Sequence, residues 1–183
     1  MDVLIVVDMQ NDFVSGALGT AEARAIVPEV VRRVADAVDR QEMIFFTRDT
    51  HGPDYLQTQE GRRLPVPHCI RGTQGWELIS QLSAYAAGRP LVDKPTFGSA
   101  DLARMLRAQD QSLRALGGRV EKITLIGLCT DICVISNALL LKAFLPEAEI
   151  TVDAACCAGV TPESHQTALA AMETCQITVE AAG

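Results

Sequence analysis

The segment Lys122–Leu145, which reads KITLIGLCTDICVISNALLLKAFL, indicates the fold class most directly. Its first five residues form an apolar, β-branched run that is typical of a strand. The residues from about Asp131 to Leu145 form a longer apolar stretch, followed by Pro146, that predicts a helix. A strand followed closely by a helix is the building unit of sheets with parallel strands.

The same alternation extends along the rest of the chain. Val3–Val7 (VLIVV) is uninterrupted and apolar, which is typical of a strand covered on both faces. We predict strands at Val3–Val7, Met43–Thr47, Leu91–Asp93, Lys122–Ile126, Ile150–Asp153 and Ile177–Glu180, and further helices at Ala21–Arg40, Gly75–Ala87, from Ser99 onward and at Pro162–Thr174. This order predicts one α/β domain, residues 1–183, in which a mostly parallel six-stranded sheet carries helices on both faces. Ligands bind at the carboxyl ends of the strands in such sheets.

Composition excludes several classes of protein. The chain has 183 residues, of which 48% are hydrophobic, and this suits one domain with a large core rather than a disordered chain. A net charge of -7 argues against a general nucleic-acid binder. The longest apolar stretch, Ile132–Leu145, is too short to span a membrane, and Asp2 and Asp8 do not suit a signal peptide. We therefore expect a cytoplasmic protein whose six cysteines are mostly reduced.

A long polar stretch from Asp49 to Gly75 is the first candidate for a functional site, because loops of this length are usually functional or disordered. Asp49 and His51 lie at the end of the second predicted strand, and Glu60 and His68 follow on the same stretch. Carboxylate and imidazole groups are both good ligands for a borderline metal, which predicts a metal site here. The alternative is a turn aspartate with surface histidines.

Three reactive side chains are expected at the same edge of the sheet. Asp8 ends the first strand, Lys94 follows the third, and Cys133 lies in the first turn of the helix after the fourth, with Thr130 as the expected N-cap. At that position the helix dipole and backbone N–H groups would lower the pKa of a thiol and can hold an oxyanion. The alternatives are a capping carboxylate, a surface lysine and an inert buried thiol.

Taken together, these segments resemble the isochorismatase-like cysteine hydrolases, and most closely the nicotinamidase branch. The motifs that carry the resemblance are VVDMQNDF, DTH, PHCIRGTQG, KPTFGS and GLCTDICV, in this order and over nearly the whole chain. The resemblance implies a three-layer α/β/α, Rossmann-like fold. It also implies a catalytic triad of Asp8, Lys94 and Cys133, in which the thiol attacks a small carboxamide such as nicotinamide and forms a thioester before the acid and ammonia are released.

The resemblance extends to the groups around this triad. It implies one divalent metal, with zinc favoured and manganese or iron as alternatives, held by Asp49, His51, His68 and, in some relatives, a glutamate that matches Glu60. It implies an oxyanion hole formed by the backbone N–H groups of Cys129 and Cys133, with a cis peptide bond before Cys129. Phe13 and Leu18 match substrate contacts. Relatives of this kind are commonly dimers or tetramers, so self-association is expected, with a small-molecule amide as the ligand.

Two positions depart from the family pattern. Pro65 and Thr50 stand where relatives often carry aromatic residues, so catalysis is predicted more firmly than the identity of the amide. One alternative function is a metal-independent amidase or a vinyl-ether hydrolase on the same fold. Another is a redox-sensing module that uses Cys129 and Cys133.

Overall fold

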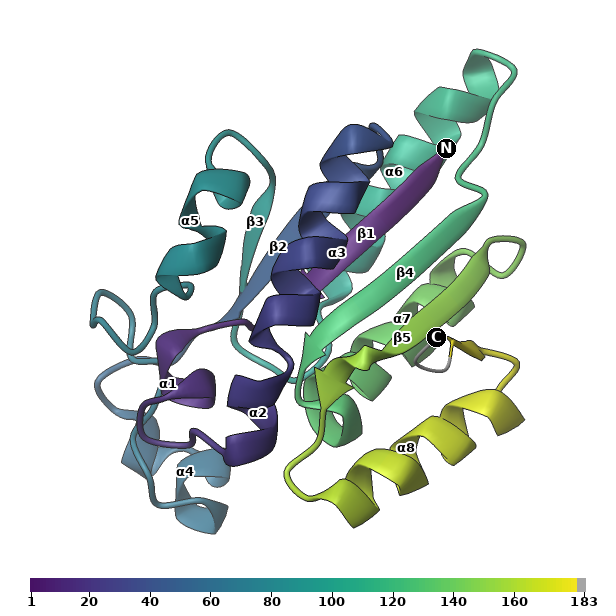
Figure 1. The fold of residues 1–183 in the computed structure, drawn as a ribbon. Helices are drawn as coiled ribbons and strands as arrows, with labels where there is room; N and C mark the ends of the chain where they lie inside the picture. The colour runs from purple at the N-terminus through teal and green to yellow at the C-terminus, as the bar shows by residue number, and fades with distance from the viewer. Residues whose placement is uncertain (181–183) are drawn as a thin grey trace.

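Six parallel strands form the central sheet of the structure, a computed structural model that describes residues 1–180 (Figure 1). The strands are β1 (Asp2–Val7), β2 (Met43–Asp49), β3 (Leu91–Lys94), β4 (Lys122–Leu128), β5 (Glu149–Ala158) and β6 (Thr178–Glu180). The helices are α1 (Asn11–Val14), α2 (Ala21–Ala25), α3 (Val27–Asp39), η1 (Tyr55–Gln57), α4 (Gln59–Arg63), α5 (Ser80–Ala86), α6 (Ala100–Ala115), η2 (Thr130–Val134), α7 (Ile135–Phe144) and α8 (Pro162–Thr174). The predicted α/β class and the six strands are confirmed.

Two hydrophobic layers hold the helices to the sheet. In β1, Val3, Ile5 and Val7 pack against one layer, which contains residues of α6, α7 and α8. Leu4 and Val6 pack against the other layer, which contains residues of α3 and α5. Successive side chains of a strand point to opposite faces, so an uninterrupted apolar run is what a sheet covered on both faces requires.

The strand order β3-β2-β1-β4-β5-β6 determines where on the sheet a ligand is expected to bind. From β1 the chain winds outward through β2 and β3, and then it returns to the other side of β1 through β4. The carboxyl ends of β1 and β4 therefore flank the point where the winding reverses, which is where open α/β sheets bind ligands. In Figure 1 these strand ends point toward α1, α2 and α4.

Two helices, α6 and α8, begin where the sequence predicts, because residues at their own amino ends set the first turn. Ser99 caps α6 by accepting a hydrogen bond from the Leu102 N–H at 3.1 Å, and Pro162 begins α8 as predicted. The helix predicted over Ala21–Arg40 is instead two helices that meet at Ile26, because Pro28 lies in the first turn of α3 and cannot donate a backbone hydrogen bond to a preceding turn.

The helix predicted over Gly75–Ala87 covers only Ser80–Ala86. The residues before it form backbone contacts with the chain that follows β1: Gln10 forms an antiparallel bridge with Leu78, and the Asn11 N–H donates to the Glu77 carbonyl at 3.0 Å. These long-range hydrogen bonds take the place of a first helical turn. Within residues 1–180, no helix combines the length and the apolar character needed to cross a membrane.

Candidate active site

Asp8, Lys94 and Cys133 converge at the carboxyl edge of the sheet. The Lys94 ammonium lies 2.6 Å from Asp8 Oδ2 and 3.3 Å from Cys133 Sγ. Asp8 and Lys94 are 0% exposed and Cys133 is 4% exposed, so the three groups interact away from bulk water. The Thr47 hydroxyl donates a 2.6 Å hydrogen bond to Asp8 Oδ1 and orients the carboxylate. The structure thus brings together the three residues that the sequence had assigned to one edge.

Burial controls the protonation of this group. It raises the pKa of the Cys133 thiol well above its ordinary value, although Lys94 opposes the shift. Burial also raises the pKa of Asp8, again against the opposing charge of Lys94. The expectation that a helical turn lowers the pKa of Cys133 is therefore not met, because loss of hydration outweighs the local dipole. The Cys133 thiol and the Asp8 carboxylate are therefore neighbouring buried groups that both have raised pKa values. A proton can move between two such groups.

The turn that carries Cys133 is held on several sides. The peptide bond between Leu128 and Cys129 is cis, as the resemblance implied. Residues 130–134 then form a π-helical turn, in which Cys129, rather than Thr130, takes the N-cap position. The Thr130 hydroxyl is instead 2.7 Å from Nδ1 of His165 on α8. Gly127 precedes the turn at φ 114°, and a Cβ there would overlap the Val7 carbonyl, so only glycine lets β4 approach β1 this closely.

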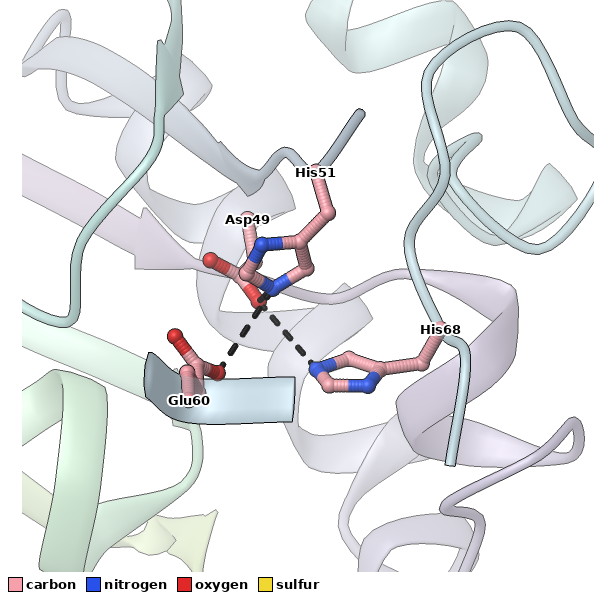
Figure 2. Close-up of side chains that lie close together, drawn as sticks. All are labelled: Asp49, His51, Glu60 and His68. Carbon is pink, nitrogen blue, oxygen red and sulfur yellow. Dashed lines mark hydrogen bonds and ion pairs between the residues drawn. The ribbon is translucent and has the colours of Figure 1, made fainter. Parts of the chain in front are cut away.

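A second group of four side chains lies close together (Figure 2), and one of them, Asp49, is 3.4 Å from the Lys94 ammonium. One ligand atom from each of Asp49, His51, Glu60 and His68 lies within 4.8 Å of all the others. Nε2 of His51 is 2.9 Å from Asp49 Oδ2 and 3.6 Å from Glu60 Oε1, and Nε2 of His68 is 3.6 Å from the same Asp49 oxygen. The long polar stretch is ordered by η1 and α4, and α4 carries Glu60 toward the two imidazoles.

The donor set fits a divalent metal. Nδ1 of His68 is 2.8 Å from the Val66 carbonyl, an arrangement that leaves Nε2 as the ligand atom. Although burial opposes it, hydrogen bonds from His51 and His68 hold the pKa of Asp49 well below its ordinary value, so the carboxylate is ionised. Two imidazole nitrogens and two carboxylates suit zinc, manganese or iron. The Tyr55 ring packs against both imidazoles, with centroids at 4.6 Å from His51 and 5.0 Å from His68.

Gln10 joins the two groups and was not identified from the sequence. Its side chain is fully buried, and its Oε1 accepts a 2.7 Å hydrogen bond from the Asp49 N–H. Its Nε2 donates to the carbonyls of Asp49 at 2.9 Å and Trp76 at 2.8 Å. The strand end that presents Asp8 is thereby tied to the one that presents Asp49. The sequence held no separate signal for this role, because Gln10 lies among other polar residues in VVDMQNDF.

A cavity of about 590 Å³ opens onto both groups. Cys133, Glu60 and His68 lie on its wall, together with Phe13 and Leu18, the two residues predicted to contact substrate. Leu64, rather than its neighbour Pro65, contributes to the lining. The Thr50 hydroxyl accepts a 2.8 Å hydrogen bond from Trp76 Nε1, so this residue serves the packing of the loop. Phe97, Ile132 and Val160 complete much of the apolar wall and were not identified from the sequence.

Comparison with known proteins agrees with this geometry. A family model described as the isochorismatase domain matches residues 2–182. The nicotinamidase of Escherichia coli (strain K12) is 26% identical, in a match that covers 93% of this chain and 89% of that protein. The crystal structure of a nicotinamidase/pyrazinamidase from Bacillus subtilis has a TM-score of 0.80 at 28% identity and covers 97% of this chain and 98% of its own.

A second solved structure is the pyrazinamidase of Pyrococcus horikoshii in complex with zinc. It has a TM-score of 0.79 at 26% identity, with 99% of each chain covered. The family match spans almost every described residue, and the structural matches extend over the whole sheet and its helices. The chain therefore belongs to the isochorismatase family and is an amidohydrolase.

Proposed function

We propose that the chain is a metal-assisted cysteine amidohydrolase that converts nicotinamide, or a related small aromatic carboxamide, to the acid and ammonia. The observation that carries the proposal is the buried Asp8–Lys94–Cys133 group, whose Cys133 lines the same cavity as three of the four candidate metal ligands, Asp49, Glu60 and His68. The names of relatives support the substrate class: the Escherichia coli protein is a nicotinamidase, and the Pyrococcus horikoshii protein is a pyrazinamidase solved with zinc.

The first half of the proposed reaction uses Asp8 as the base. Its carboxylate takes the thiol proton of Cys133 while the sulfur attacks the amide carbonyl carbon. The carbonyl oxygen becomes an oxyanion, and in this proposal the backbone N–H groups of Cys129 and Cys133 hold it. Lys94 keeps a positive charge beside both Cys133 and Asp8. This charge lowers the free energy of the negative charge that moves between the sulfur and the carboxylate in a buried site.

The second half releases the products. Protonated Asp8 gives its proton to the departing nitrogen as the carbon–nitrogen bond breaks, which leaves a thioester on Cys133 and frees ammonia. Asp8 then takes a proton from a water molecule that attacks the thioester carbonyl. The sulfur–carbon bond breaks, the proton returns to the sulfur, and the carboxylic acid leaves.

Asp49, His51, Glu60 and His68 are the residues that would hold the metal. A bound divalent cation would supply a Lewis acid for a ring nitrogen or a carbonyl oxygen of the substrate. The Phe13 ring, which lies 5.6 Å from the His68 ring, offers an apolar surface for an aromatic acyl group between the metal ligands and the thiol.

An ammonia-release assay tests the proposal. Metal-replete protein should release ammonia from nicotinamide, and Cys133→Ala should abolish the activity, whereas Cys175→Ala, the same change at an exposed cysteine, should retain it. Mass spectrometry of rapidly quenched enzyme should find the acyl group on Cys133. Full activity of Cys133→Ala would refute the nucleophile, and no turnover by metal-replete enzyme would refute the substrate. Activity that survives chelation would favour the metal-independent alternative.

A further inference from the structure

The cavity above Cys133 is larger than one aromatic ring requires. Its volume of about 590 Å³ lies within the range of roughly 300–1,000 Å³ that is typical of sites for drug-sized ligands. Cys133, Asp49 and His68 line its buried part, since each of them is at most 4% exposed. A pyridine carboxamide bound there would leave the outer part filled with water.

The outer part is lined by large apolar side chains that remain partly in water. Leu64 is 39% exposed, Phe97 is 44% exposed and Val160 is 50% exposed, and all three lie on the cavity wall. They come from three separate connections, which follow α4, β3 and β5. Large apolar side chains exposed around one opening usually mark a surface that binds an apolar group.

The backbone of two of these residues is anchored to the nucleophile turn and the helix after it. The Val160 N–H donates to the Asp131 carboxylate at 3.1 Å, and the Phe97 carbonyl accepts a 3.1 Å hydrogen bond from the Asn137 side chain. Because these bonds involve only the backbone of Val160 and Phe97, their side chains are free to contact a ligand. Leu64, Phe97 and Val160 together form an apolar rim around the cavity, and these two backbone bonds give the rim a defined position relative to Cys133.

We propose that the preferred substrates are primary carboxamides whose acyl group carries an apolar substituent that extends from the ring to this rim. The inference rests on the proposed function and narrows it. The amide lies at the inner, polar end near Cys133, and the substituent displaces water from Leu64, Phe97 and Val160. Arg63 also lines the cavity, so an acidic substituent is the main competing possibility.

The test is a series of nicotinamides that carry methyl, ethyl, propyl or carboxyethyl groups at ring position 5, assayed by ammonia release with metal-replete enzyme. Each added methylene that becomes buried should raise kcat/KM about three- to fourfold, so the propyl compound should exceed the methyl compound by about tenfold. Val160→Asp and Phe97→Ser should each reduce this propyl-to-methyl ratio. The matched control is Leu116→Asp, because Leu116 is 86% exposed and lies on the connection that enters the amino end of β4, away from the cavity.

The outcomes separate the two proposals. Turnover of nicotinamide with a flat or falling alkyl series would overturn the apolar substituent and leave the amidase intact. A carboxyethyl compound that exceeds the propyl compound, with the difference lost in Arg63→Gln, would replace the apolar group by an anionic one. No ammonia from nicotinamide or from any member of the series would refute the proposed function, and the inference with it.

Discussion

Replacement of Lys94 by methionine should show how far a buried ion pair stabilises this fold. Lys94 Nζ lies 2.6 Å from Asp8 and 3.4 Å from Asp49, and none of the three side chains is more than 3% exposed. Unit charges about 4 Å apart interact by about 4 kcal/mol at an effective dielectric of about 20. Removal of one partner from a buried pair costs about 3–5 kcal/mol, because the remaining charge is left uncompensated.

The chain offers a matched control in Lys122→Met. Lys122 also forms a 2.6 Å ion pair, with Glu180, but its side chain is 31% exposed and that of Glu180 is 46% exposed. Water screens such a pair, so the substitution should cost less than about 1 kcal/mol. Urea denaturation of the metal-free proteins, followed by circular dichroism, gives both free energies of unfolding.

Two results would refute this reasoning. One is a loss in Lys94→Met no larger than that in Lys122→Met, which would mean that the buried charges are solvated in a way the geometry does not indicate. The other concerns Asp8→Asn in the Lys94→Met background. That second substitution removes the stranded charge and should recover part of the stability, so strictly additive losses would show that the two side chains do not interact.

Three further predictions concern the metal ligands and the fold. His68→Ala should lower the metal content of purified protein by elemental analysis, whereas His165→Ala, outside the ligand cluster, should not; equal loss in both would contradict the site. Gln10→Met should weaken metal binding about 10–100-fold in a competition titration, because ligand-supporting hydrogen bonds have effects of that size; unchanged affinity would show that Asp49 is held by its strand alone. Although burial opposes it, hydrogen bonds from Arg114 and from the Val120 N–H hold the pKa of Asp110 below its ordinary value of 3.8. The wild type should therefore exceed Asp110→Asn in unfolding free energy above about pH 4, and the difference should decline as the pH falls below that value; a difference that grows in acid would refute the assignment.

Local sequence patterns were enough to predict the strands, the parallel sheet and the edge that carries the reactive groups. Alternating and uninterrupted apolar runs depend on neighbours in the chain, and Ser99 and Pro162 begin their helices through contacts within one turn. Because parallel strands end at one edge, placing Asp8, Lys94 and Cys133 after three different strands already predicts that they meet. The two motif departures, Pro65 and Thr50, do not themselves line the cavity, where Leu64 takes the place expected of Pro65.

Only the tertiary structure decided what depends on contacts between distant segments. The pKa of Cys133 rises because the completed fold excludes water from the thiol, and a helical turn considered alone predicts the opposite direction. Gln10 acquires its role only when β2 and the segment that carries Trp76 fold against the end of β1. The rim of Phe97 and Val160 likewise belongs to no single motif, because burial and cavity shape arise from packing across the whole chain.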